Sequence, residues 1–256
     1  MLKYKTDTIV SVFSCLSTHI KYNRYMKKII KNYPEVRWIA HRGLSSKYLE
    51  NTVKAYKAAA KLPFFGIETD IHLTLDNIPI THHDHNLARL SNNTSNLKDL
   101  SYNDLKSIKL KEKYSIPTLK EYLKIVKLNH KVAVIEFKPT FTSHQIKLVF
   151  DHITSYINLN HVIIISFHLE NLIKIRQDYP DMMLQYLTDK FDKDTLKQLK
   201  MQQIDYSLHH SVLNHKIIQT IHQAGLRVAT WTVNHLEDAL KFIEMKVDYI
   251  TTDGIF

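Results

Sequence analysis

Short apolar segments alternate with amphipathic segments along most of this 256-residue chain, and this rhythm restricts its fold more than any other feature. The run Val162–Ile165 is apolar and β-branched on both faces, which is typical of strands covered by helices on both sides of a parallel sheet. Eight such units in roughly 220 residues fit a closed (β/α)₈ barrel, the TIM barrel. The predicted strands are 36–40, 65–73, 131–137, 161–167, 182–187, 204–208, 226–233 and 247–251.

The two ends of the chain depart from a complete barrel. The last predicted strand, 247–251, comes so late that the C-terminal eighth helix is lacking. Residues 1–35 precede the barrel, and their apolar positions recur at helical spacing, which predicts an amphipathic helix or helix pair. We expect this N-terminal extension to pack on the barrel, either filling the gap in the outer ring or capping the floor. The domains are therefore a helical segment, 1–35, and a barrel domain, 36–256.

Charge and cysteine content limit the partners. The net charge of +10 and the pI near 9.4 favour anionic ligands, but the lysines are spread along the chain without a dense basic tract. We therefore expect no nucleic-acid partner. The single Cys15 excludes an internal disulfide and disfavours a cysteine metal site. The short apolar stretch near the N-terminus is interrupted by charge, which disfavours a signal peptide. We expect a cytoplasmic protein, with peripheral membrane contact through residues 1–33 left open.

Three carboxylates fall at the ends of two adjacent predicted strands, Glu68 and Asp70 on one and Glu136 on the next. Reactive groups in such barrels lie at the C-terminal strand ends, and residues two apart on a strand share a face. Acids this close repel one another unless a cation holds them, and oxygen ligands favour a hard divalent ion. Ion pairs with Arg42 and Lys138 are the alternative without metal, but two cations leave three carboxylates with a negative remainder.

Two histidines and an arginine are expected at the same rim. His41 and Arg42 end the first strand, and His82 and His83, of which one is the second candidate, lie between the acidic strands in the sequence. A divalent ion beside two histidines and an arginine indicates the cleavage of an anionic ester. Trp231 ends the seventh strand, where an aromatic wall of a substrate cleft and plain core packing are both open.

The motifs around these residues carry a family resemblance that spans about residues 38–253. In chain order they are His41-Arg42-Gly43, Glu50-Asn51-Thr52, Gly66-x-Glu68-x-Asp70, Thr74-x-Asp76, Ile80-Thr81-His82-His83-Asp84 with Leu87 and Arg89, Ile116-Pro117-Thr118-Leu119, Glu136-Phe137-Lys138, Ser166-Phe167, Trp231-Thr232-Val233-Asn234 and Thr251-Thr252-Asp253. Together they resemble the glycerophosphodiester phosphodiesterase family, relatives of the bacterial phosphatidylinositol-specific phospholipases C. Leu49 and Asn77 depart from the family pattern without removing a ligand or a proton-transfer group.

The resemblance implies a role for each candidate residue. His83 is preferred to His82 as a catalytic residue because the family's histidine directly precedes the aspartate. The implied ligands of one divalent cation, Ca²⁺ or Mg²⁺, are Glu68, Asp70 and Glu136; the implied general acid/base pair is His41 and His83; and the implied phosphate and substrate contacts are Arg42, Lys138 and Trp231.

The implied activity is hydrolysis of glycerophosphodiesters, small molecules, to glycerol 3-phosphate and an alcohol. One histidine would activate the nucleophile and the other would protonate the leaving alkoxide, without the sequence deciding which. A lysophospholipase D or sphingomyelinase D-like activity on membrane lipids is the alternative, with residues 1–33 as a membrane contact. The preferred alcohol, the native metal, the oligomeric state and the attack by water or by a neighbouring hydroxyl stay open.

Overall fold

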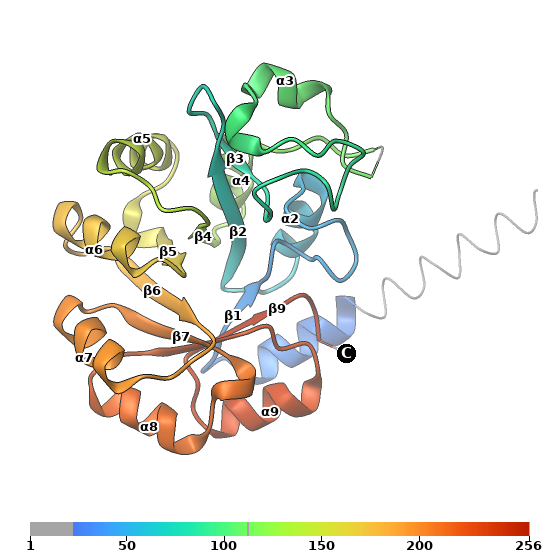
Figure 1. The fold of residues 1–256 in the computed structure, drawn as a ribbon. Helices are drawn as coiled ribbons and strands as arrows, with labels where there is room; N and C mark the ends of the chain where they lie inside the picture. The colour runs from blue at the N-terminus through green and yellow to red at the C-terminus, as the bar shows by residue number, and fades with distance from the viewer. Residues whose placement is uncertain (1–22, 112, 256) are drawn as a thin grey trace, which may run out of the picture.

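The computed structural model describes residues 23–111 and 113–255, and its strands form a closed parallel barrel surrounded by helices (Figure 1). The sheet order is β1-β9-β8-β7-β6-β5-β4-β2-β3, and a further pairing of β1 with β2 closes the ring. The predicted TIM barrel is thus confirmed, and no helix follows β9 among the described residues. The strands are β1 (Arg37–Ala40), β2 (Gly66–Leu73), β3 (Pro79–Thr81), β4 (Val132–Phe137), β5 (Val162–Ser166), β6 (Met183–Thr188), β7 (Asp205–His209), β8 (Val228–Trp231) and β9 (Tyr249–Thr252).

The helices between successive barrel strands form the outer ring. Their starts are set by local capping: Thr118 and Glu121, for example, exchange side-chain and backbone hydrogen bonds at the first turn of α4. The helices are α2 (Val53–Ala60), α3 (Tyr102–Ser107), α4 (Leu119–Leu128), α5 (Ser143–Thr154), α6 (Leu169–Asp178), α7 (Lys193–Gln202), α8 (His215–Gln223) and α9 (Leu236–Glu244), with 3₁₀ turns η1 (Leu97–Asp99), η2 (Leu159–His161) and η3 (His210–Val212).

Two apolar layers result from the alternation of strand side chains. One lies between the strands and the helices and contains the largest buried cluster, with Trp38 and Phe150 among its members. The other fills the barrel interior, where Val134, Ile163 and Ile165 pack together. The interior is therefore a packed core below the mouth, and polar side chains are concentrated at the C-terminal ends of the strands.

Residues 74–118, between β2 and α4, form an insertion at the side of the barrel next to β2 (Figure 1). The short β3 pairs antiparallel with β2 and lies outside the closed ring. The sequence there is rich in polar residues, yet its spaced leucines make a separate small core with Ile80 and Ile116. The insertion is thus an ordered cover beside the mouth, and it contributes His83.

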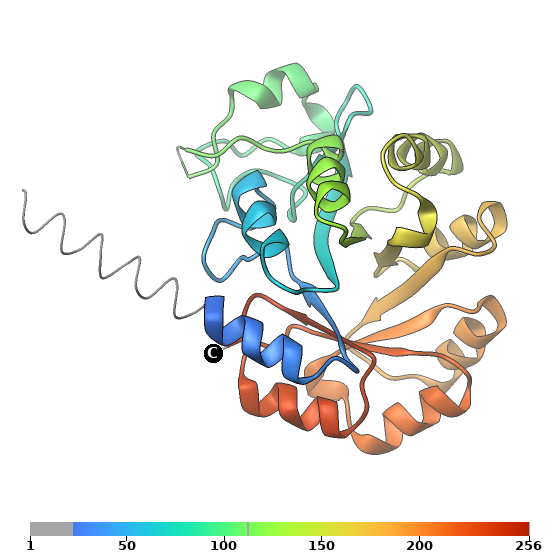
Figure 2. The same cartoon turned by 180° about the vertical axis from the view of Figure 1, so that it is seen from behind.

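The described part of the N-terminal segment is helical over residues 23–32 and lies beside α9 in both views (Figures 1 and 2). Met26, Ile29 and Ile30 are buried in the main core, and the backbone N–H of Ile255 donates to Met26 Sδ at 3.2 Å. Of the two expected placements, this part takes the outer ring. Its apolar residues Met26, Ile29 and Ile30 are covered by the barrel, and the rest of the segment for which a membrane contact was left open, residues 1–22, lies outside the described residues. No helix in 23–111 or 113–255 has the length and apolarity to cross a bilayer.

Replacing Met26 with alanine tests whether this helix is part of the folded core. Met26 is fully buried, so Met26→Ala should lower the free energy of unfolding by about 2–5 kcal/mol. The exposed neighbour Lys27 offers a matched control, because Lys27→Ala keeps the helix and removes no buried contact. Urea denaturation of both variants measures the difference. Equal stabilities would contradict the packing described here.

Candidate active site

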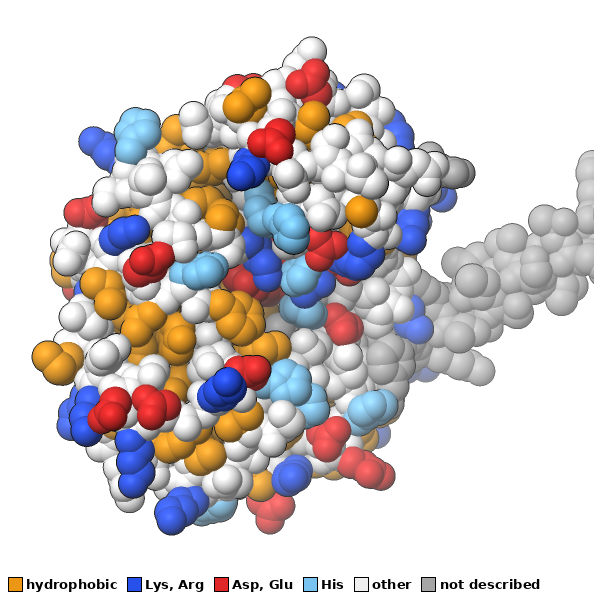
Figure 3. Space-filling view, viewed as in Figure 1, with side chains coloured by type: hydrophobic (Ala, Val, Ile, Leu, Met, Phe, Trp, Pro, Cys, Tyr) orange, Lys and Arg blue, Asp and Glu red, His pale blue; other side chains and the backbone are white. Residues whose placement is uncertain are grey.

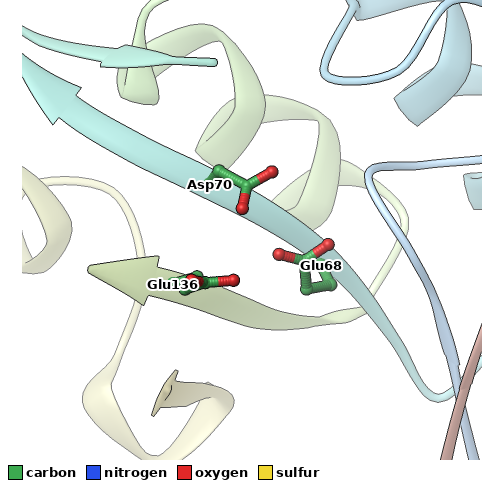
Figure 4. Close-up of side chains that lie close together, drawn as sticks. All are labelled: Glu68, Asp70 and Glu136. Carbon is green, nitrogen blue, oxygen red and sulfur yellow. The ribbon is translucent and has the colours of Figure 1, made fainter. Parts of the chain in front are cut away.

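An acidic cluster of Glu68, Asp70 and Glu136 lies at the barrel mouth, and each residue offers an oxygen within 4.8 Å of the others (Figure 4). Glu68 and Asp70 share one face of β2, and the parallel register sets the Cα of Asp70 opposite that of Glu136 on β4. All three are buried, with exposures of 1%, 0% and 7%. The predicted convergence of these three side chains is therefore present in the structure.

The charges of the cluster are poorly balanced. Burial, followed by the charge of Asp70, raises the pKa of Glu68 well above its usual range. The same two causes raise the pKa of Glu136 to about 7, against the opposing effect of Lys138. Burial alone would raise the pKa of Asp70, but the charges of Arg42 and Lys138 outweigh it and hold that pKa well below its usual range. The three carboxylates would all be ionised at neutral pH only with a further positive charge between them.

Two cationic side chains contact the cluster but leave two of its oxygens without a hydrogen bond. Arg42 Nε lies 3.2 Å from Asp70 Oδ2, and Lys138 Nζ lies 2.8 Å from Glu136 Oε1 and 3.6 Å from Asp70 Oδ1. Buried Glu68 Oε1 and Asp70 Oδ1 have no hydrogen-bond partner among the described residues. Orphaned carboxylate oxygens in an all-oxygen donor set fit a hard divalent cation. The ion-pair alternative accounts for Arg42, Lys138 and, at 3.6 Å, Asp70 Oδ1, but not for Glu68 Oε1.

The end of β1 is shaped to hold one of these acids from the backbone. Arg42 and Gly43 have positive φ values of 54° and 82°, and a Cβ on Gly43 would lie 2.6 Å from the carbonyl carbon of Ala55. Glycine is therefore required at this turn. The turn aims the backbone N–H of Arg42 at Glu68 Oε2, 2.8 Å away. The His-Arg-Gly motif thus positions both a histidine and a metal-ligand candidate.

His41 is held by a carboxylate that is distant in sequence but follows β9, the strand paired with β1. Its Nδ1 donates to Asp253 Oδ1 at 2.8 Å, and Asp253 also accepts from Ser45 at 2.7 Å and Asn234 at 2.8 Å. Burial would raise the pKa of Asp253, but these hydrogen bonds and the charge of His41 hold it well below its usual range. An ionised Asp253 fixes the ring and leaves Nε2 of His41 as the nitrogen able to exchange a proton with a ligand.

His83 is held in the same manner from the insertion. Its Nδ1 donates to Asp84 Oδ1 at 2.7 Å, and Arg89 Nε donates to Asp84 Oδ2 at 2.6 Å. Burial would raise the pKa of Asp84, but hydrogen bonds from Arg89 and His83 lower it to about 2. Glu50 then links Arg89 to Arg42, with N–O distances of 2.6 and 3.0 Å. This chain of ion pairs ties the insertion to the turn after β1.

A cavity of about 140 Å³ joins these groups at the mouth. Seven of the eight candidate residues line it, and Asp70 lies fully buried beneath them. The space-filling view shows histidine, basic and acidic side chains gathered in a hollow, with hydrophobic side chains beside it (Figure 3). Trp231 lines the cavity and packs edge-to-face on Phe167, with ring centroids 5.3 Å apart. The lining candidates are His41, Arg42, Glu68, His83, Glu136, Lys138 and Trp231.

The other histidines near the rim lie differently. His82 is buried and its Nε2 donates to the carbonyl of Asn86 at 3.1 Å, so it faces the insertion and does not line the cavity. His72 donates from Nε2 to the carbonyl of His83 at 3.2 Å, and burial chiefly lowers its pKa to about 4. His72 thereby supports the loop that carries His83. Of the adjacent pair, His83 is the one that faces the cavity.

Asn51 has a structural role that its motif alone did not reveal. It adopts a left-handed φ of 52°, which asparagine tolerates well, and its Nδ2 donates to Asp70 Oδ2 at 2.7 Å. Its Oδ1 accepts from the hydroxyls of Tyr56 and Thr69, both at 3.0 Å. Asn51 therefore orients Asp70 through a buried network. The position of Asn51 in the Glu-Asn-Thr motif was the available sequence signal.

A closed parallel barrel with an oxygen-ligand cluster, two carboxylate-held histidines and two cations at its mouth defines the class of barrel hydrolases that act on anionic esters. Comparison with known proteins points to one family. The family model described as the glycerophosphoryl diester phosphodiesterase family matches residues 41–255. The glycerophosphodiester phosphodiesterase of Caldanaerobacter subterraneus subsp. tengcongensis is 31% identical over 228 residues, which cover 84% of this chain and 93% of the relative.

Solved structures show the same fold at lower identity. A phosphodiesterase of Oleispira antarctica, in complex with the product sn-glycerol-3-phosphate, superposes with a TM-score of 0.80 at 22% identity, covering 85% of this chain and 92% of the other. A glycerophosphodiester phosphodiesterase of Parabacteroides distasonis gives 0.75 at 24%, covering 86% and 93%. This chain belongs to the glycerophosphoryl diester phosphodiesterase family and is a phosphoric diester hydrolase.

Proposed function

We propose that this enzyme hydrolyses glycerophosphodiesters to glycerol 3-phosphate and an alcohol, with one bound divalent cation, Ca²⁺ or Mg²⁺. The observation that carries the proposal is the acidic cluster, in which two buried oxygens accept no hydrogen bond from the described residues. It lies next to a cavity lined by two histidines that are each held by a carboxylate. Membership of the family supports a phosphodiester substrate. The names of the relatives and the product bound to the Oleispira antarctica protein support a glycerol ester.

Each charged group has a part in holding the phosphate. Glu68, Asp70 and Glu136 would hold the cation, which when bound would polarise a phosphoryl oxygen. Lys138 lines the cavity and offsets charge that develops on the phosphate. Arg42 does the same from a fixed position, because Asp70 and Glu50 hold its guanidinium.

The two histidines exchange protons with the reacting oxygens. One takes the proton of the nucleophile, either water or a neighbouring glycerol hydroxyl, and the other gives a proton to the leaving alkoxide. The paired carboxylates Asp253 and Asp84 hold Nδ1 of His41 and His83, so the transfers occur at Nε2. Because both histidines are held by a carboxylate in the same way, the geometry does not distinguish the acid from the base, and experiment must assign them.

The activity test also tests the cation. We expect the purified chain to release glycerol 3-phosphate from glycerophosphocholine, glycerophosphoethanolamine or glycerophosphoglycerol. A chelator should abolish the release, and added Mg²⁺, Ca²⁺ or Mn²⁺ should restore it, since Arg42 and Lys138 do not balance the three carboxylates of the acidic cluster. A coupled assay for glycerol 3-phosphate measures both results. Undiminished turnover after exhaustive chelation would contradict the metal, and no turnover of any glycerophosphodiester with any ion would contradict the substrate class.

One observation favours the alternative of a lysophospholipase D or sphingomyelinase D-like activity. Phe167 is 42% exposed at the rim of the cavity, where an acyl chain could contact it. Lysophosphatidylcholine and sphingomyelin in vesicles, offered beside glycerophosphocholine, decide between the two. Faster turnover of the lipids would favour the alternative, and we expect the opposite.

A further inference from the structure

Gln185 is a polar side chain in a strand that is otherwise mostly apolar, and it lines the active-site cavity from β6. It is 3% exposed, and its Nε2 has no hydrogen-bond partner among the described residues. A buried amide donor without a partner destabilises the folded state, whereas an apolar side chain of the same size does not. The position therefore fits a donor that is satisfied by a ligand.

The register fixes the height of Gln185 in the barrel. Glu136 pairs with Ile165, and Ile165 pairs with Gln185, so the three lie at one level on successive strands. Glu68, Glu136 and Gln185 thus line the same cavity. A phosphate held at the cluster would direct one of its ester groups towards Gln185.

The size and lining of the cavity define the chemical class of that group. With about 140 Å³, the cavity is the smaller of the two spaces at the mouth and suits a small group such as a three-carbon polyol. Ile165, Leu187 and Trp231 give it apolar walls, and Gln185 adds a hydrogen-bond donor. An apolar carbon chain that carries hydroxyls matches both features.

The second ester group has a separate place. A wider groove of about 610 Å³ runs between the insertion and the β4–α5 loop, and it shares His83 and Lys138 with the cavity. Lys98, His85 and Gln145 also line the groove. A diester whose phosphate lies at the shared residues would place a small group in the closed cavity and a group of variable size in the groove.

Building on the proposed function, we propose that Gln185 determines specificity for the glycerol group by donating a hydrogen bond from Nε2 to one of its hydroxyls. The leaving alcohol then occupies the groove. Gln185 acts in binding and orientation, and no proton is transferred. Loss of one such hydrogen bond corresponds to about a tenfold loss of affinity.

Calorimetry on the metal-loaded enzyme with glycerol 3-phosphate and propyl phosphate tests this role. The two ligands share the phosphate and the three-carbon chain and differ in the hydroxyls. Gln185→Met keeps the volume and removes the donor. It should weaken glycerol 3-phosphate about tenfold and leave propyl phosphate within twofold of the wild type. Gln177→Leu, on the exposed face of α6, is the control for a glutamine replacement and should change neither.

Thermal unfolding adds a readout that separates ligand recognition from a structural role. Because Gln185→Met removes an unsatisfied buried donor, its Tm without ligand should equal or exceed that of the wild type by a few degrees. Unchanged affinities, or an equal loss for both phosphates with a lower Tm, would overturn the inference. Turnover of glycerophosphodiesters by the wild type keeps that failure distinct from failure of the proposed function.

Discussion

Glu68→Gln is expected to abolish divalent-cation binding and to reduce hydrolysis of glycerophosphodiesters about a thousandfold, since the cation supplies several kcal/mol of charge stabilisation in the transition state. Glu68 has a buried oxygen without a hydrogen bond, and no cationic side chain in 23–111 or 113–255 lies at ion-pair distance, so the divalent cation is its natural counter-charge. Titration calorimetry with Mg²⁺, Ca²⁺ and Mn²⁺ measures the binding, and kcat/KM measures the activity. Glu170→Gln, on the exposed surface of α6, is the matched control.

The same substitution should leave the fold intact. Burial and the charge of Asp70 raise the pKa of Glu68 and so favour its neutral form in the cation-free protein, which an amide resembles. The Arg42 N–H can still donate to the amide oxygen. We expect urea denaturation without added metal to give the wild-type stability within about 0.5 kcal/mol. Wild-type cation affinity in Glu68→Gln would contradict the assignment of the cluster.

Asp70→Asn is compared with Glu68→Gln to distinguish a residue that only binds the cation from one that also holds several ion pairs. Asp70 contacts Arg42, Lys138 and Asn51, and it is fully buried. Removing its charge takes one carboxylate partner from the half-buried Arg42 and Lys138, which keep only Glu50 and Glu136, and breaking such a buried ion-pair centre costs about 3–5 kcal/mol. Both variants should thus lose the cation, but only Asp70→Asn should lose much stability. A comparable loss in both would mean that the cluster is held mainly by ion pairs.

Much of the barrel was predictable because its signal is local. The β-branched run at 162–165 and the helical periodicity between strands follow from short-range patterns, and the resulting topology places the strand ends at one rim. Once that rim is known, Glu68, Asp70 and Glu136 must converge, since β2 and β4 are neighbours in register. The position of the site therefore follows from the predicted order of the strands.

The rest depends on contacts between distant segments. The polar stretch after β3 contains a small core that the sequence does not indicate, because leucines spaced by turns follow no helical or strand period. Asn51 meets Asp70 and Tyr56 through a left-handed turn whose geometry the sequence does not specify. Gln185 is visible only as a polar interruption of an apolar strand, a pattern that a surface-facing position would also produce.

His41→Ala and His83→Ala are each expected to lower hydrolysis of glycerophosphocholine by about 10²–10⁴-fold, the usual contribution of a general acid or base. Cation affinity should stay near that of the wild type, because neither histidine belongs to the acidic cluster. Steady-state kinetics and calorimetry on the same preparations measure the two effects. His144→Ala, on the exposed surface of α5, is the control. Wild-type rates in both catalytic variants would contradict the acid/base pair.

A change of leaving group then assigns the two roles. p-Nitrophenolate departs without needing a proton, so glycerophospho-p-nitrophenol relieves the enzyme of general acid catalysis but not of general base catalysis. The variant that lacks the acid should lose less than about tenfold on this substrate, whereas the variant that lacks the base should lose as much as on glycerophosphocholine. Because Asp253 and Asp84 hold His41 and His83 alike through Nδ1, the geometry itself favours neither order. Equal losses on both substrates for both variants would mean that neither histidine protonates the leaving oxygen.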